Sequence, residues 1–306
     1  MSYLGFKTAT TFVLTNSGCL REVNQIFEWN FRLRSCAMLA SRKVKSALSG
    51  AEVHEGWERT YKSDKNARFW GLAHDWLFKA FDFPPNARLL DVGCGTGHHA
   101  IQFARRGYQA IACDFSLDRL EFASGNAAAL GARINVCGQD VTSLGFRDNS
   151  FDGVLCWGVL MHVPEIENAM AELLRVTNHR GKIILYEDNL WSIDSLIQTL
   201  GVAAKMALGS AGTRRLAMMP YGLESWVRTP IGELLIRQAR IRSIVRFFER
   251  HGCYLLARRG GQFTELYRLF PGMALASALQ SFDNFWFSRI RSPRLAYGNF
   301  LVFERS

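Results

Sequence analysis

Three carboxylates stand at or near the ends of three short apolar runs in the middle of the chain. Asp91 follows Leu89-Leu90, Asp114 closes the run YQAIACD, and Asp140 closes INVCGQD. If these runs are neighbouring parallel strands, their carboxyl ends meet at the edge where open α/β sheets bind ligands. Carboxylates there can accept hydrogen bonds from hydroxyl and amino groups. The pattern therefore predicts a polar ligand at this edge.

A glycine-rich stretch follows the first of these runs, and residues 89–100 read LLDVGCGTGHHA. Gly93, Gly95 and Gly97 occupy alternate positions, and apolar residues at helical spacing begin at Ile101. Glycine tolerates positive φ and lets the backbone come close to a ligand. The helix start behind it offers unpaired N–H groups. The stretch predicts a strand, a tight turn and a helix that together hold a ligand.

Two ligand classes fit the glycines. Residues 95–100, GTGHHA, satisfy the G-x-G-x-x-A pattern of nicotinamide dinucleotide sites. Asp91 argues against a dinucleotide, since a pyrophosphate would lie near it, whereas a cationic ligand group would be favoured. Asp114 can accept hydrogen bonds from both ribose hydroxyls of any adenosine, with Phe115 packing on the adenine. The alternative for Asp114 is an acidic cap on the next helix.

The pattern D-x-G-x-G-x-G from Asp91 to Gly97, after a hydrophobic strand, resembles the first motif of class I S-adenosylmethionine (SAM) dependent methyltransferases. The resemblance implies SAM as the cofactor, with Asp114 on the ribose and Asp140 on the adenine amino group. It assigns to the cofactor the residues Asp91, Gly93, Gly95, Gly97, Asp114, Phe115, Asp140, Val141, Trp157, Gly158, Tyr61 and Arg68.

The segment of residues 156–164, CWGVLMHVP, follows the fourth apolar run. It resembles the corresponding segment of small-molecule methyltransferases of the ubiquinone/menaquinone-biosynthesis type. It lacks the N-P-P-Y or D-P-P-Y of amino-directed nucleic-acid methyltransferases. Trp157 and Gly158 are expected beside the methionine part of the cofactor. His162 is a candidate general base, because its pKa lies near neutrality; alternatively, it holds the loop by hydrogen bonds.

Further polar groups are candidates for the acceptor side. Glu187 and Asp188 end the fifth apolar run, where a substrate would lie, although either could cap the next helix. Tyr221 lies in the segment that follows. The seven cysteines form no C-x-x-C pair, and the adjacent His98 and His99 cannot share one helix face. We therefore expect no metal site.

Short apolar runs and helical patterns alternate along the chain. Strands are expected at residues 87–93, 108–114, 134–140, 151–158, 182–187, 253–258 and 299–304. Alternation of this kind predicts βαβ units and a parallel sheet. The resemblance adds an antiparallel last strand between the fifth and the sixth. The expected fold is a doubly wound, seven-stranded, mostly parallel α/β sheet of the Rossmann-like methyltransferase type, with helical cap insertions.

Four parts are expected along the chain. They are a basic helical segment at 1–56, a SAM-binding core at 57–188, a helical cap at 189–240, and the completion of the core at 241–306, with a helical insertion at about 262–294. The cap is expected because residues 189–240 show no strand signal and are too many for a plain connection. By the resemblance, Tyr61 and Arg68 would close over the cofactor.

The charge pattern bears on partners and location. The formal net charge is +10, and the basic residues lie mainly outside the central part. Arginines stand beside aromatic residues at 20–48 and 274–291, which suits either packing against the core or a peripheral contact with a membrane surface. No apolar run is long enough to span a membrane, and no secretory signal is expected. The unpaired cysteines favour a cytoplasmic protein.

The sequence thus predicts a SAM-dependent methyltransferase that acts on a small molecule, with an amphipathic, lipid-linked or glycan-like acceptor. A nucleic-acid methyltransferase is the first alternative and is favoured by charge alone. An NAD(P)-dependent oxidoreductase is the second alternative, because it shares the glycine pattern. The acceptor, the methylated atom, the general base and the oligomeric state stay open.

Overall fold

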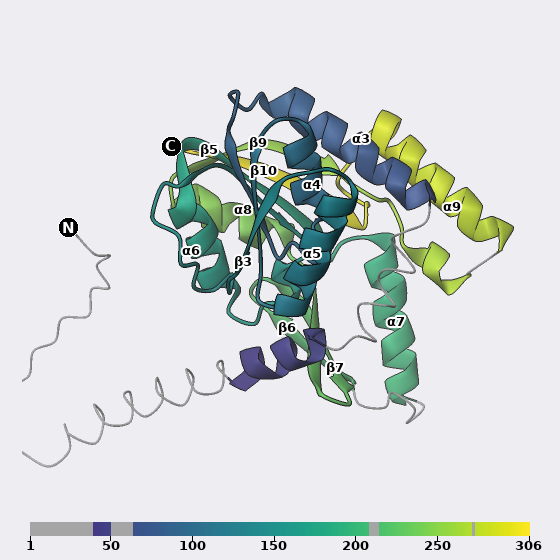
Figure 1. Cartoon of the computed structure of the whole chain (residues 1–306). Coiled ribbons are helices and arrows are strands. Elements are labelled where there is room, and N and C mark those ends of the chain that lie inside the picture. Colours follow the sequence, from purple (N-terminus) through teal and green to yellow (C-terminus); the bar gives the residue numbers. More distant parts are fainter. Residues whose placement is uncertain (1–38, 50–63, 208–213, 271–272) are drawn as a thin grey trace, which may run out of the picture. The chain divides into compact units, whose positions relative to one another are not determined.

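The computed structural model describes residues 39–49, 64–207, 214–270 and 273–306 (Figure 1). The contacts of the chain divide it into two units, residues 1–39 and 40–306, and the description below concerns the second unit. Most of the expected basic segment at 1–56, and Tyr61, lie outside the described residues; residues 40–48 are helical.

A seven-stranded sheet forms the centre, in the order β3-β2-β1-β4-β5-β10-β9. Its strands are β1 Arg88–Val92, β2 Gln109–Asp114, β3 Ile134–Gly138, β4 Phe151–Trp157, β5 Thr177–Asp188, β9 Cys253–Gly260 and β10 Gly298–Arg305. The pairs among the first five strands are parallel, whereas β10 is antiparallel to both β5 and β9. The expected Rossmann-like sheet, with its antiparallel last strand between the fifth and sixth core strands, is confirmed.

Helices follow most strands of this sheet. They are α3 Asp64–Phe81, α4 His98–Arg105, α5 Leu117–Ala129, α6 Ile166–Val176, α7 Ile193–Ala207, α8 Ile241–Arg250 and α9 Ala274–Phe285. Shorter turns are η1 Leu160–His162 and η2 Leu266–Leu269, and a π turn, η3 Trp286–Ile290, prolongs α9.

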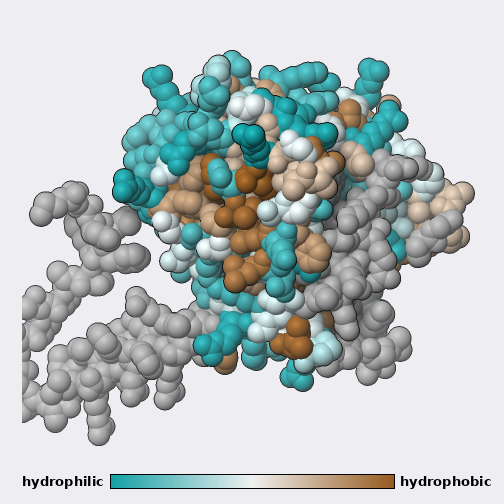
Figure 2. Space-filling model, in the orientation of Figure 1, coloured by the Kyte–Doolittle hydropathy of each residue, from teal (hydrophilic) through white to brown (hydrophobic). Residues whose placement is uncertain are grey.

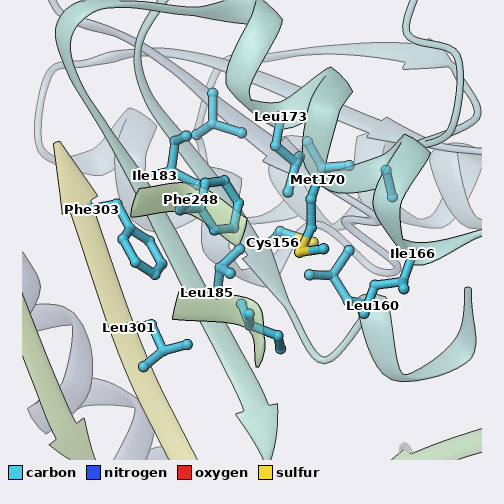
Figure 3. Packing of buried hydrophobic residues seen from close by; sticks show 14 of the residues in the cluster. Cys156, Leu160, Ile166, Met170, Leu173, Ile183, Leu185, Phe248, Leu301 and Phe303 are labelled. Carbon is cyan, nitrogen blue, oxygen red and sulfur yellow. The ribbon is translucent and has the colours of Figure 1, made fainter. Parts of the chain in front are cut away.

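Both faces of the sheet are covered, as a mostly parallel sheet requires. Figure 3 shows one face, where Met170 and Leu173 of α6 and Phe248 of α8 lie over Ile183 and Leu185 of β5. Helices α3, α4 and α5 cover the other face, with buried residues that include Phe69, Ala73, Leu77, Ala100, Phe103, Leu120 and Ala123. The alternation along each strand sends successive side chains into these two cores.

The expectation of a mostly helical cap at 189–240 is wrong for its second half. After α7 the chain forms a three-stranded antiparallel sheet from β6 Arg214–Met219, β7 Gly222–Thr229 and β8 Gly232–Ala239. Two of the inward positions of this sheet are polar, since Glu224 and Arg237 are buried. The strands therefore lack the apolar alternation by which a half-buried strand is recognised.

Arg237 connects this second sheet to the turn that follows β4 of the central sheet. Its side chain is fully buried, and it donates to Glu224 Oε1 from Nε at 3.1 Å and from Nη2 at 2.6 Å. Its Nη1 donates to the carbonyl oxygens of Leu160 at 2.7 Å and Val163 at 2.9 Å. Because Leu160 belongs to η1, directly after β4, the ion pair positions the turn that carries His162.

The surface is mixed. Figure 2 shows hydrophobic side chains gathered near the middle of the visible face, surrounded by hydrophilic ones. Exposed apolar side chains include Trp191, Leu196 and Leu200 in and beside α7. Among the described residues, no helix is both long and apolar enough to span a membrane.

Replacement of Arg237 tests the connection between the two sheets. We expect Arg237→Ala to lower the free energy of unfolding by about 3–5 kcal/mol, because it leaves the Glu224 carboxylate buried without its counter-charge. Denaturant titration followed by tryptophan fluorescence measures the change. Arg228→Ala, at an exposed position of the same sheet, is the control and should change stability by less than about 0.5 kcal/mol. Equal effects of the two variants would contradict this role of Arg237.

Candidate active site

A cavity of about 1090 Å³ opens at the carboxyl ends of the central strands. Ligand pockets usually measure about 300–1,000 Å³, so this one has room for more than a single small ligand. One end is lined by the glycine loop and by the residues after β2 and β3; the other end is lined by residues after β5, from η2 and from α7. The two ends are lined by different types of residue.

The three glycines of the loop have positive φ values, +67° at Gly93, +51° at Gly95 and +80° at Gly97. A Cβ at Gly93 would lie 2.5 Å from Val159 Cγ2, and one at Gly97 would lie 2.9 Å from Ala123 Cβ. A Cβ at Gly95 would meet no protein atom within 4 Å, and Gly95 lines the cavity. Gly93 and Gly97 therefore allow close packing within the protein, whereas Gly95 exposes its backbone to the cavity, where a ligand could approach it.

Asp91 does not face the cavity. Its side chain is buried, its Oδ2 accepts the Ala100 N–H at 3.1 Å, and the residue is not among those that line the cavity. Burial raises the pKa of Asp91 to about 7, against a lowering by the Ala100 hydrogen bond. The geometry does not support the expected contact of Asp91 with a cationic ligand group. The carboxylate instead satisfies an unpaired N–H in the first turn of α4.

Asp114 lines the cavity and also shapes it. Its Oδ2 accepts the Gly95 N–H at 3.0 Å, and its Oδ1 accepts the Ser116 N–H at 2.9 Å. The neighbouring Phe115 lines the cavity as well. The ribose-binding position and the turn-capping position proposed from sequence are therefore compatible, because one carboxylate can serve both.

Asp140 and Val141 line the same end of the cavity. Asp140 Oδ1 accepts hydrogen bonds from the N–H of Thr142 at 3.0 Å and from its hydroxyl at 2.8 Å. Its Oδ2 forms an ion pair with Lys45 of the helix at 40–48. Burial acts to raise the pKa of Asp140, but the Lys45 and Thr142 contacts outweigh it, and the pKa is lowered. The carboxylate is thus ionised at neutral pH.

An aromatic wall lies beside the glycine loop. The Trp157 ring stacks on His99, with centroids 4.5 Å apart, and on Tyr186, with centroids 4.7 Å apart. Burial lowers the pKa of His98 to about 4, so this cavity-lining histidine is uncharged at neutral pH. The structure places Trp157 and the adjacent Gly158 at the cavity, as expected. The histidines were not expected as part of this wall.

His162 lines the cavity, and its Nδ1 lies 2.6 Å from the carbonyl oxygen of Leu235 in β8. Because a carbonyl only accepts, Nδ1 carries the hydrogen. The loop-holding alternative for His162 is thus what the geometry shows, and a role as base would fall to Nε2.

Glu187 and Tyr221 are not among the cavity-lining residues. Glu187 is buried, and burial raises its pKa, whereas the backbone N–H groups of Leu160 and Met161 in η1 lower it. The Tyr221 hydroxyl donates to Glu167 Oε1 at 2.7 Å. Arg68 is exposed and lies outside the cavity lining, where α3 contributes Ala67 and Trp70 instead. These three side chains therefore hold structure or face solvent.

The other end of the cavity carries polar side chains from segments far apart in sequence. The Tyr297 hydroxyl donates to Asp188 Oδ2 at 2.5 Å, and Arg268 pairs with Glu265 at 2.9 Å. All four residues line the cavity. Tyr297, Glu265 and Arg268 were not foreseen, because they lie in or next to the late insertion, and only the three-dimensional fold brings them to the end of β5.

The chain was compared with known proteins. Residues 90–185 match the family model described as a methyltransferase domain. A demethylmenaquinone methyltransferase of Thermobifida fusca is 34% identical over 144 residues, which cover 46% of this chain and 59% of that enzyme. The corresponding enzyme of Streptomyces avermitilis is 35% identical over 36% of this chain and 46% of its own length. The chain therefore spans about half the length of these relatives.

Among solved structures, a magnesium protoporphyrin IX methyltransferase from Synechocystis PCC 6803, determined with bound SAH, superposes with a TM-score of 0.54. It is 18% identical, and the match covers 87% of this chain and 100% of that one. This likeness concerns the fold. The matched residues 90–185 run from β1 into β5, the strands that carry the glycine loop and its carboxylates, so this part of the chain is a methyltransferase domain of the S-adenosylmethionine-dependent kind.

Proposed function

We propose that the protein transfers the methyl group of SAM to a hydroxyl-bearing, amphipathic small molecule. The observation that carries the proposal is one continuous cavity with two different ends. The glycine loop with Asp114 and Asp140 lies at one end, and an enclosed polar group around Asp188 lies at the other. Methyl transfer needs such a joint enclosure, since much of its catalysis can come from holding two reactants in line.

The first end fits an adenosyl cofactor. Asp114 lines the cavity and could accept hydrogen bonds from ribose hydroxyls, and the ionised Asp140 could accept one from the adenine amino group. The bare backbone at Gly95 leaves space for the ligand to approach. When bound, SAM supplies an electrophilic methyl group on a cationic sulfur. The uncharged His98 and the stacked Trp157 next to the loop add no competing positive charge.

The second end fits an acceptor with an apolar body. Ile197 of α7 and Leu266 and Leu269 of η2 line one side of it, beside the charged Asp188, Glu265 and Arg268. By their names, the relatives from Thermobifida and Streptomyces act on demethylmenaquinone. We extend from these observations to a hydrophobic, lipid-linked acceptor and a peripheral membrane contact, which the exposed Trp191 and Leu200 support.

The cofactor half of the proposal predicts the effect of one substitution. Asp114→Ala should weaken binding of S-adenosylhomocysteine at least roughly 100-fold, because hydrogen bonds to a charged group are each worth about 1.5–3 kcal/mol. Titration calorimetry measures the affinity, and circular dichroism checks that the fold is kept. Asp118→Ala, at an exposed position on α5, is the matched control and should bind normally. Unchanged affinity in Asp114→Ala would refute the ribose assignment.

If the acceptor is hydrophobic, methyl label should appear in the organic-soluble fraction of a cell extract. Methyl-labelled SAM, incubated with the protein and a cell extract, should deliver label to material that partitions into organic solvent. Prior nuclease treatment of the extract should leave this transfer unchanged. Label confined to a nuclease-sensitive fraction would instead support the nucleic-acid alternative and overturn the proposal.

A further inference from the structure

Asp188 is the one carboxylate of β5 that reaches the cavity, since the adjacent Glu187 does not line it. The Asp188 side chain is only 7% exposed, and it stands at the carboxyl end of its strand. Its Oδ2 is held by the Tyr297 hydroxyl at 2.5 Å. Tyr297 in turn precedes β10, whose first residue Gly298 pairs in register with Asp188. The carboxylate is therefore fixed by two neighbouring strands.

The second carboxylate oxygen, Oδ1, takes part in no hydrogen bond among the described residues. Oδ1 is not one of the buried side-chain atoms that lack a partner, so it keeps accessible surface although the residue as a whole is buried. Asp188 lines the cavity, so a partner can reach it from there. In its ionised form the carboxylate only accepts, so a ligand group that meets Oδ1 would be a hydrogen-bond donor.

The approach to Asp188 is apolar on one side. Ile197 comes from α7, and Leu266 and Leu269 come from η2. The neighbouring Arg268 is engaged by Glu265 at 2.9 Å. A ligand whose donor group reaches Asp188 would thus place a hydrophobic body against α7 and η2.

We propose that Asp188, oriented by Tyr297, binds the hydroxyl group of the acceptor and takes its proton during methyl transfer. This inference rests on the proposed function. In the step, the acceptor oxygen attacks the SAM methyl carbon and the new C–O bond forms. The C–S bond breaks and leaves its electron pair on sulfur, giving S-adenosylhomocysteine. The hydroxyl proton passes to Asp188 Oδ1 and later to solvent. No other reactant is required.

The side chains expected from sequence are less well placed for this task. Glu187 holds η1 by its backbone contacts, and Tyr221 donates to Glu167 outside the cavity lining. His162 is tied to β8 by its Nδ1. Asp188 lines the cavity, and one of its carboxylate oxygens, Oδ2, is held by Tyr297.

Several charged groups around Asp188 set its protonation. Burial, and next the Glu265 carboxylate, raise the pKa of Asp188 well above its ordinary value, and Asp194 of α7 adds to the rise. The Tyr297 hydrogen bond and the Arg268 guanidinium lower it. Glu187 lies beside it on β5. A proton acceptor with a raised pKa is a stronger base than an ordinary carboxylate once it is ionised.

The test uses 2-naphthol and its methyl ether, 2-methoxynaphthalene, as probes. Both are flat and hydrophobic, and only 2-naphthol has a hydroxyl group. Each is titrated calorimetrically into the full-length protein saturated with S-adenosylhomocysteine. The wild type should bind 2-naphthol roughly ten- to hundredfold more tightly than the ether, as expected for a hydrogen bond to a charged group. Asp188→Asn should bring the two affinities to within about threefold.

The pH dependence separates a direct role of Asp188 from a structural one. In the wild type, the affinity for 2-naphthol should rise with pH as Asp188 ionises, below the pH at which the probe itself ionises. Tyr297→Phe removes a bond that lowers the pKa of Asp188, so the rise should move to higher pH. Asp188→Asn should show no such rise. Asp118→Asn changes an exposed residue of α5 and should behave as the wild type.

Three results would overturn the inference: equal affinity of the wild type for both probes, discrimination that persists in Asp188→Asn, or binding of neither probe. Each of them leaves the cofactor site untouched, because S-adenosylhomocysteine binding is measured first on the same samples. A failure of that first binding would instead count against the proposed function.

Discussion

The site depends on one constraint: the glycine loop must leave its backbone bare for a ligand while its own N–H groups find partners. Two carboxylates resolve this constraint. Asp91 accepts the N–H of Ala100, and Asp114 accepts that of Gly95. The loop is thereby held in positive φ values that only glycine adopts without strain. A bare loop without these acceptors would carry unpaired buried N–H groups, which folded proteins avoid.

A second link connects the two ends of the cavity, which we propose to hold the cofactor and the acceptor. The buried pair of Arg237 and Glu224 ties the three-stranded sheet to η1, and η1 is also held by Glu187 from β5. The turn after β4 is thus fixed from two sides, and with it His162. The same inserted region contributes α7, which lines the acceptor end. The insertion therefore does more than cover the cavity, because it positions the residues at the junction between both ends.

The core strands, the place of the last strand between the fifth and the sixth, and the position of the glycine loop, Asp114 and Asp140 at the cavity could be predicted, because apolar runs, glycines and strand-end carboxylates leave a local signal. Two kinds of feature could not. The sheet at 214–239 was missed because Glu224 and Arg237 occupy inward positions, and they pair with each other only after folding. Tyr297, Glu265 and Arg268, which surround Asp188, lie in the late insertion or just after it, so no local pattern in the sequence predicts that they meet. Asp91 was assigned to the ligand because spacing alone cannot tell a carboxylate that faces a ligand from one that faces its own loop.

A crystal structure of the protein with S-adenosylhomocysteine would test the assignment of the two cavity ends most directly. We expect the ribose hydroxyls within hydrogen-bonding distance of Asp114, the adenine beside Asp140, and the sulfur directed toward Asp188. A ligand bound elsewhere, or with its adenine at the Asp188 end, would contradict the assignment of the two ends of the cavity.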